Sequence, residues 1–380
     1  MKNITLCSFL LLCFCSMPLL SLKDKVNDTA ENTKPTAAAA SPSTSQTTTP
    51  AVAKVAPRKV ASKPFILNVQ AFIMLQSIEF QNPEEKEALL KNAARAVELK
   101  IGYPRTWTPE ANQVIAPLTN VRSLFISAAT ANDLPLLPCP EKLGSLTFGH
   151  NAFQTIQNIA HYTNLHTLRL SNKSLSVTNQ DPNKTDRLAV LTQLHNLRTL
   201  HCGTLFTLDH KAPDERALLI RILGSNSEIQ DFTCAGGVAT DVVQALATLP
   251  LRRLLLMNGE IDDEKFARLP FNTLEELRFY GRHTLTDLTP LRDSALRVFH
   301  LHNQENLNDT LPQVICSMPH LEELDLRFCR LTDAQAKPLL QLSQRLRQLK
   351  LGGGRPRLST EMCQRLKAAF GDKVSLETRP

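Results

Sequence analysis

The chain has 380 residues, of which 42% are hydrophobic and 21% charged, and a formal net charge of +7 at pH 7. Residues 1–63 hold eight Lys and Arg and three Asp and Glu, which leaves 35 basic and 33 acidic residues in the rest of the chain. Nucleic-acid binding normally requires a concentrated basic surface. The near-neutral remainder therefore argues against a nucleic-acid-binding protein. Length and composition fit one elongated domain behind a basic tail.

The first 22 residues have the layout of a secretory signal peptide, with Lys2 ahead of an apolar stretch from Ile4 to Leu22. Two alternatives remain open at this stage. Leu12-Cys-Phe-Cys15 partly resembles a bacterial lipoprotein box, and 19 mostly apolar residues approach the length of a membrane anchor. We predict export to a secreted or cell-envelope location, with contact to a membrane only through this segment.

Residues 23–63 differ in composition from the rest of the chain. They contain four successive alanines, Ala37 to Ala40, then a Ser/Thr/Pro-rich run over 41–50, and no aromatic residue. Such a segment cannot bury enough apolar surface to offset the entropy of ordering. We predict a disordered linker.

Residues 64–95 are expected to form a helical N-terminal cap that covers the first repeat of the domain behind it. The segment from Phe65 to Phe80 is apolar, and Asn82-Pro83-Glu84-Glu85 has the features of a helix start. These features are an N-cap side chain, Pro at the first helical position and acidic residues in the first turn.

The dominant feature of the chain is a phrase, apolar-x-x-apolar-x-apolar, that occurs eleven times between Ala96 and Leu351. Successive copies start 22 to 32 residues apart, and eight of the ten spacings lie within 20–29 residues. The copies begin at Ala96, Val121, Leu143, Leu165, Leu197, Ile229, Leu251, Leu274, Leu296, Leu321 and Leu346. This regularity predicts a solenoid that spans residues 96–380.

The phrase has a simple physical meaning. Its fourth and sixth residues point to the same side of a short strand, because side chains alternate along a strand. One repeat cannot bury this apolar side alone, whereas parallel stacking of successive repeats buries it continuously. The sequence therefore predicts a parallel sheet whose strands come from successive repeats.

The copy from Leu321 to Ala336, Leu-Glu-Glu-Leu-Asp-Leu-Arg-Phe-Cys-Arg-Leu-Thr-Asp-Ala-Gln-Ala, resembles a leucine-rich repeat of the ribonuclease-inhibitor-like or cysteine-containing type. Cys329 and Asn151 hold the ninth position that the family gives to Cys or Asn, whereas Asn172, Asn258 and Asn303 stand one residue early. The resemblance implies an α/β solenoid shaped as a curved horseshoe. Its strands would line the concave face, its helices the convex face, and a partner, usually a protein, would bind the concave face.

Two repeats are 32 residues long and carry about ten extra residues each. In the second, we predict a helix that begins at Pro213 and Asp214 and ends at Gly224. In the first, the polar run 179–186 is expected to lead into a helix. The extra length either extends convex helices or projects a recognition surface.

Cys202 and Cys234 hold the sixth position of neighbouring repeats, so they are expected about 5 Å apart in the core. A disulfide between them is conceivable. We favour the simpler interpretation that each replaces a core leucine.

The concave face can be read from the pattern, because the fifth residue of each phrase and the residue after its sixth point away from the core. In the C-terminal half these positions and their neighbours combine apolar and aromatic residues with arginine, as the centres of protein interfaces do. The candidate partner-binding residues are Arg253, Leu255, Met257, Arg278, Tyr280, His300, His302 and Arg327. The alternative is a solvated face whose charges are neutralised by Glu276, Glu323 and Asp325.

Catalytic motifs are absent from the sequence, including the metalloprotease, nucleophile-elbow, phosphate-loop and dinucleotide patterns. Gly352-Gly-Gly354 lacks the Lys-Ser/Thr pair of a phosphate loop, so we interpret it as a loose turn. His300 and His302 could bind a metal with Asp325, but we interpret them as ordinary exposed histidines. We predict no enzyme activity, no metal and no cofactor.

The function that the sequence favours is an exported, non-catalytic recognition module that binds a protein partner through its concave face. The alternative is a structural envelope or surface component that self-associates or is tethered through its N-terminal tail.

Overall fold

The computed structural model describes residues 66–68, 94–101, 115–126, 130–131, 134–149, 152–153, 156–170, 184–203, 206, 213–257, 261–281, 285–304, 310–354 and 358–377. All of them belong to one compact unit, Ala61–Pro380. The expected signal peptide and linker lie outside the described residues. So does most of the expected N-terminal cap, including its helix start at Asn82.

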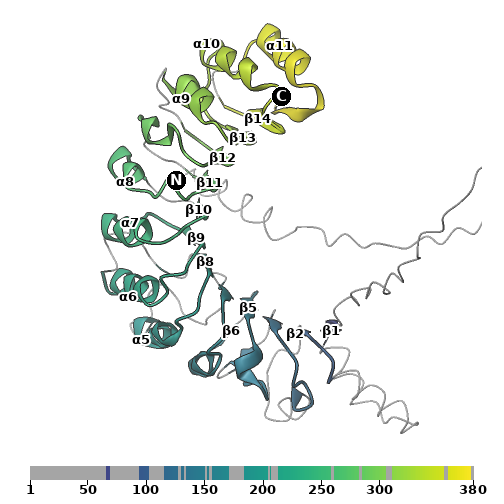
Figure 1. Ribbon diagram of the computed structural model, residues 1–380, viewed down its shortest axis with the longest axis vertical. Coiled ribbons are helices and arrows are strands. Elements are labelled where there is room, and N and C mark those ends of the chain that lie inside the picture. Colours follow the sequence, from purple (N-terminus) through teal and green to yellow (C-terminus); the bar gives the residue numbers. More distant parts are fainter. Residues whose placement is uncertain are drawn as a thin grey trace, which may run out of the picture. The chain divides into compact units, whose positions relative to one another are not determined.

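A parallel sheet of 13 strands runs through this unit (Figure 1). Each strand pairs in parallel with the strand of the next repeat, apart from a separate two-stranded pair, β4 and β6. The strands are β1 (Ile66–Asn68), β2 (Glu98–Ile101), β3 (Ser123–Ile126), β4 (Thr130–Ala131), β5 (Ser145–Phe148), β6 (Ala152–Phe153), β7 (Thr167–Arg169), β8 (Thr199–Gly203), β9 (Asp231–Ala235), β10 (Arg253–Met257), β11 (Glu276–Tyr280), β12 (Val298–Leu301), β13 (Glu323–Asp325), β14 (Gln348–Gly352) and β15 (Val374–Glu377).

The helices lie on the outer side of the curved sheet, and the strands line its inner side (Figure 1). They are η1 (Pro140–Lys142), η2 (Gln157–His161), α5 (Lys184–Leu188), η3 (Ala189–Gln193), α6 (Pro213–Gly224), α7 (Thr240–Ala247), α8 (Asp263–Ala267), η4 (Thr289–Leu291), α9 (Leu311–Ser317), α10 (Asp333–Ala336), η5 (Lys337–Leu342), α11 (Thr360–Phe370) and η6 (Gly371–Lys373), where η marks a 3₁₀ helix. The predicted helix Pro213–Gly224 is confirmed as α6.

Side-chain caps fix several helix starts. Asp262 accepts a hydrogen bond from the backbone N–H of Lys265 at α8, and Thr332 with Gln335 forms a capping box at α10. The caps stabilise helices that are too short to persist alone.

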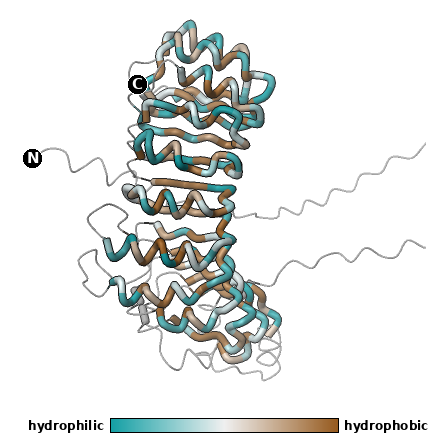
Figure 2. The backbone as a smooth tube through the Cα atoms, turned by 60° about the vertical axis from the view of Figure 1, so that its left-hand side comes forward, coloured by the Kyte–Doolittle hydropathy of each residue, from teal (hydrophilic) through white to brown (hydrophobic). Residues whose placement is uncertain are grey.

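The predicted phrase is confirmed in every copy. Each of the eleven copies provides one strand, and all three of its apolar positions are buried, with at most 4% of each side chain exposed. The register aligns equivalent positions, for example Leu254 with Leu277 and Leu256 with Phe279. Figure 2 shows the repeats as stacked turns in which hydrophobic and hydrophilic stretches alternate. One apolar core therefore runs along the repeats, as expected for a solenoid.

Both ends of the sheet carry a strand that the sequence analysis did not predict. β1 pairs with β2 and aligns Leu67 with Leu99, within the segment expected to form the cap. β15 pairs with β14 and aligns Leu376 with Leu351.

Polar side chains join successive N-terminal repeats just before the phrases at Val121, Leu143, Leu165 and Leu197 begin. Asn120, Asn164 and Asn196 donate to the carbonyls of Ala94, Glu141 and Thr163, and Lys142 donates to that of Thr119, over 2.7 to 2.8 Å. In each pair the donor is the residue before the phrase and the acceptor is two residues before the preceding phrase. These bridges close the gap between neighbouring turns on one edge of the solenoid.

Three of the described cysteines, Cys202, Cys234 and Cys329, lie in the core as single residues. Cys202 and Cys234 are buried and unbridged, and a bulge in β8 aligns Cys234 with Gly203 instead of Cys202. The expected equivalence of the two positions is therefore broken locally by one residue. Cys329, the ninth-position cysteine, is buried and its thiol donates to the carbonyl of Leu301 over 3.1 Å.

The glycine triplet after β14 is a packing feature, which corrects the expectation of a loose turn. A Cβ on Gly352 would lie 2.5 Å from the carbonyl oxygen of Glu377, and one on Gly353 would lie 2.6 Å from the Phe328 ring. A Cβ on Gly354 would collide with the carbonyl oxygen of Cys329. The absence of side chains lets the turn of the preceding repeat and strand β15 approach closely.

We expect Gly354→Ala to destabilise the protein by about 1–3 kcal/mol, because neither the new methyl group nor the Cys329 backbone has room to move. Gly224→Ala is the control, since nothing lies within 4 Å of a Cβ there. Urea unfolding followed by circular dichroism measures both. Equal midpoints for the two variants would contradict the close approach at Gly354.

Candidate partner-binding face

The predicted partner-binding residues come together on the inner side of the sheet. β10 provides Arg253, Leu255 and Met257, and β11 aligns Arg278 with Leu255 and Tyr280 with Met257. On the next strands, His300 aligns with Arg278 and with Asp325, and His302 and Arg327 follow the ends of β12 and β13. Four neighbouring strands thus carry all eight residues.

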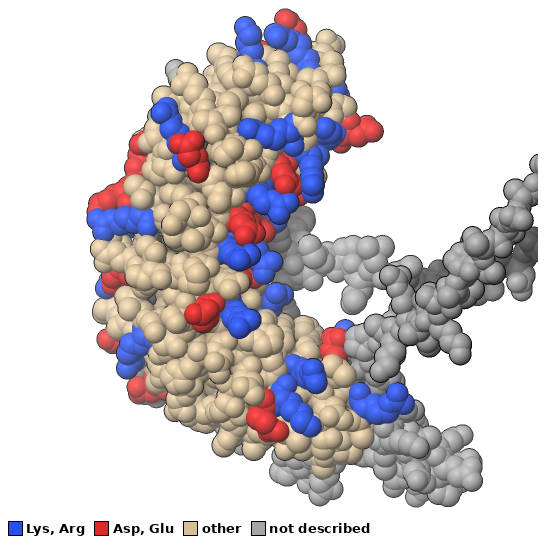
Figure 3. Space-filling model, in the orientation of Figure 1, with Lys and Arg blue, Asp and Glu red and all other residues tan. Residues whose placement is uncertain are grey.

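Each of the three arginines among the eight predicted residues is paired with a carboxylate. Arg253 lies 2.8 Å from Asp231 Oδ2, Arg327 lies 2.8 Å from Asp325 Oδ2 and 3.0 Å from Glu377 Oε1, and Arg278 pairs with Glu276. Figure 3 shows basic and acidic side chains beside one another along the inner side of the unit. The pairs hold long, otherwise flexible cations in defined positions.

Arg253 and Arg327 are more exposed than Asp231 and Asp325, which hold them. The side chain of Arg253 is 56% exposed and that of Asp231 11%, while Arg327 is 28% and Asp325 1% exposed. At these two pairs the positive group is therefore the one that faces solvent.

The two histidines are not the ordinary exposed residues that we expected. His300 and His302 are 5% and 8% exposed, because Tyr280 and Phe328 pack over them. Tyr280 Oη is hydrogen bonded to His300 Nδ1 at 3.0 Å, and the Tyr280 ring centroid lies 4.6 Å from that of His302. Phe328 adopts the left-handed region, with φ of 62°, to reach this cluster. Tyr280 is thus a half-buried aromatic anchor with a fixed orientation.

Burial, with the nearby Arg278, lowers the pKa of His300 to about 3. His300 is therefore neutral at physiological pH and serves as a hydrogen-bond partner for Tyr280. Burial also raises the pKa of Tyr280, so the phenol stays protonated.

Asp325 and Asp231 each lie beside one histidine and one arginine of the face. Burial alone would raise the pKa of Asp325, but His302 and Arg327 outweigh it and hold that pKa well below its usual range. His302 Nε2 lies 3.0 Å from Asp325 Oδ1, and His201 Nε2 lies 3.2 Å from Asp231 Oδ1. Burial likewise opposes, and His201 and Arg253 produce, the lowered pKa of Asp231. Both carboxylates are ionised anchors for an arginine.

Phe125 is a candidate that the predicted patch leaves out. It stands on β3 at the fifth position of its phrase and is one of two exposed large apolar side chains among the described residues. The signal was available in the sequence, since phenylalanine there replaces the polar residue that a solvated face favours. It lies six strands before β11 in sheet order, so it is separate from the predicted patch.

The described residues offer little chemistry for catalysis. Among them, no three His, Cys, Asp or Glu side chains are placed to hold a metal ion, and Arg327 holds the Asp325 carboxylate that a metal bound by His302 would need. Burial raises the pKa of Cys202 and of Cys329 to about 12, and that of Cys234 well above its usual value. These thiols are therefore protonated and poor nucleophiles.

The class that this fold defines is the leucine-rich repeat solenoid, with parallel strands on the inner side and helices on the outer side. No family model matches the chain, and no curated protein matches its sequence. None of the described helices has the length and apolar character needed to cross a membrane.

Among solved structures, the chain is similar to an internalin of Listeria monocytogenes, InlF, with 17% identity and a TM-score of 0.50 over 77% of this chain and 89% of that one. It also matches the mouse RP105/MD-1 complex, with 17% identity and a TM-score of 0.43 over 77% of this chain and 52% of the other. Internalin C2 of L. monocytogenes matches with 18% identity and a TM-score of 0.32 over 62% of this chain and 83% of its own. At these identities the likeness concerns the fold, and no binding residue is transferred.

Proposed function

We propose that this chain is an exported, non-catalytic recognition module whose concave sheet face binds a protein partner. The observation that carries the proposal is the patch on β10–β13, where arginines held by carboxylates surround Leu255, Met257 and Tyr280. Export rests on the layout of the first 22 residues.

The pre-positioned side chains favour a protein as the partner. Binding normally costs about 0.5–1.5 kcal/mol for each flexible side chain that becomes fixed. Arg253, Arg278 and Arg327 are already held by Asp231, Glu276 and Asp325, so much of this cost is met in the free protein. Tyrosine and arginine next to apolar groups also match the residue types that dominate binding energies at protein interfaces.

The charge pattern argues against a polyanion as the partner. A polyanion gains affinity from an excess of unpaired cations, whereas each of these arginines has its own carboxylate. Because Arg253 and Arg327 are more exposed than Asp231 and Asp325, the face suits a protein whose own carboxylates lie beside apolar side chains and act at short range. Long-range electrostatic attraction of the partner to this face should be weak, since each pair of opposite charges acts as a dipole.

We expect Arg278→Ala combined with Tyr280→Ala to weaken partner binding about 30-fold or more, as the loss of two interface anchors does. The measurement is crosslinking capture with the full chain from its native setting, followed by titration of the captured protein by surface plasmon resonance. Arg268→Ala is the control, because this exposed arginine pairs with Glu264 on α8, on the outer side.

A partner that binds the double variant as tightly as the wild-type chain would remove this patch from the proposal. Capture of copies of the chain itself, insensitive to the double variant, would favour the self-associating structural component instead. Circular dichroism of each variant excludes unfolding as the cause of lost binding.

A further inference from the structure

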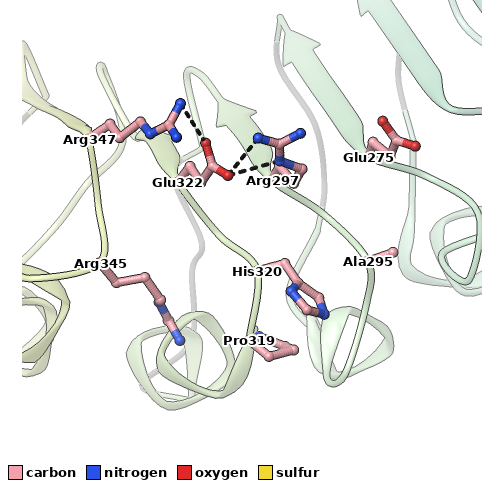
Figure 4. A pocket seen from close by; sticks show the side chains of 8 residues that line it. All are labelled: Glu275, Ala295, Arg297, Pro319, His320, Glu322, Arg345 and Arg347. Carbon is pink, nitrogen blue, oxygen red and sulfur yellow. Dashed lines mark hydrogen bonds and ion pairs between the residues drawn. The ribbon is translucent and has the colours of Figure 1, made fainter. Parts of the chain in front are cut away.

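A hollow of about 590 Å³ opens on the edge of the solenoid where the chain turns into strands β12 to β14. Figure 4 shows two rows of side chains along it, with Arg347, Glu322 and Arg297 in one row and Arg345 and His320 in the other. These residues come before the strands or at the second position of the phrase, so the hollow is distinct from the candidate partner-binding face.

The hollow lies among repeats that lack the side-chain bridge of the N-terminal repeats. In the N-terminal repeats, the residue before the phrase bridges to the preceding turn, as Asn120, Asn164 and Asn196 do. The equivalent residues at the hollow are Ala295, His320 and Arg345. The side chain of Ala295 has no donor. Within the described part of the chain, neither the His320 nor the Arg345 side chain forms the equivalent bridge.

The row of charges at the hollow is internally paired, with one arginine in excess. Arg297 donates to Glu322 Oε1 over 2.7 and 2.9 Å, and Arg347 lies 3.2 Å from Glu322 Oε2. Glu275, the other acidic lining residue, lies 3.2 Å from Arg252. Both carboxylates are therefore already engaged, while each guanidinium has five N–H groups, more than these pairs use.

Arg345 is the group without a counter-ion. Its side chain makes one long contact, 3.4 Å from a terminal nitrogen to the carbonyl oxygen of Cys316, and its Nε is buried without a hydrogen-bond partner in the described structure. No carboxylate of the described residues lies within ion-pair distance of Arg345. A buried, unsatisfied N–H favours an acceptor supplied from outside.

We propose that this hollow binds an oxyanion, a phosphate or carboxylate group, through Arg345 with support from Arg297 and Arg347. A guanidinium presents parallel N–H groups that match the two oxygens of such an anion. The small side chain of Ala295 leaves room in the hollow, and His320 lines it from the turn before that of Arg345 (Figure 4). The anion is either free or part of an acidic peptide, and both sources offer the same chemistry.

The test is isothermal titration calorimetry of the full chain at constant ionic strength, with inorganic phosphate, citrate and a blocked tetraglutamate peptide as separate probes. We expect at least one probe to bind. Arg345→Gln should weaken it about fivefold, the size expected for one partly screened charged contact. Arg268→Gln changes the charge equally on α8 and should leave binding unchanged.

Ala295→Asn is the second variant, because an asparagine there can restore the bridge to the carbonyl of Asn272 and narrow the hollow. It should weaken binding without loss of thermal stability, and it removes no charge. Binding by phosphate or citrate alone identifies a free anion, whereas binding by the peptide identifies an acidic segment. Absence of binding by all three probes, or equal affinity for wild type, Arg345→Gln and Arg268→Gln, would overturn the proposal.

Discussion

Leu324→Asp is expected to unfold the C-terminal repeats while the N-terminal repeats remain folded. Leu324 lies in the core on β13, where it aligns with Phe299 of β12 and Leu349 of β14. Loss of the leucine leaves a cavity, and the carboxylate that replaces it has no partner at this position. Together these effects should lower the free energy of unfolding by about 5 kcal/mol or more.

The unfolding should be local because each repeat of a solenoid contacts only its neighbours. Hydrogen–deuterium exchange should show loss of amide protection from β12 to β15 and retained protection in β8 to β10. Leu324→Met is the matched control, since a volume-conserving apolar exchange usually costs less than about 1.5 kcal/mol. Unchanged protection of β13 and β14 in the Leu324→Asp variant would contradict the burial of this position.

The repeat positions were predictable from the phrase. The spacing between its copies gives the period, and its apolar positions give the buried side of each strand. All eleven copies fold as parallel strands, including weak ones such as Ala96 and Ile229. The two terminal strands were missed for a physical reason. Pro64 and Gly371 stand where the first apolar residue of the phrase would be, so the sequence pattern is incomplete at both strands.

The residues of the candidate site were predictable only as positions on a face. Strand alternation placed Tyr280, His300 and His302 correctly. The burial of His302 also involves the Phe328 ring, which packs on it from a residue with left-handed φ. Likewise, the pattern gave no sign that Asp325 would be nearly inaccessible, because a fifth-position residue is normally exposed. The period can be read within each repeat, whereas a side-chain contact between repeats depends on the backbone conformation of both.

Asp325→Asn is expected to destabilise the protein by about 2–3 kcal/mol near neutral pH, because it removes the carboxylate that faces both His302 and Arg327. The cost stays below that of a fully buried pair, since Arg327 reaches solvent and keeps Glu377 as a partner at 3.0 Å. Urea unfolding of wild type and variant gives the difference. Asp372→Asn, at an exposed position, is the control.

The same difference should shrink as the pH falls. The folded-state pKa of Asp325 lies below the unfolded value of about 3.9, so its ionised form contributes stability that is fully present above that value. This contribution is lost as the pH falls from about 4 through the folded-state pKa, and the asparagine variant has none to lose. The free energies of unfolding of wild type and variant should therefore differ most near pH 7 and converge below about pH 4. A difference that is the same at pH 7 and pH 3 would show that Asp325 is not held as an ionised anchor between His302 and Arg327.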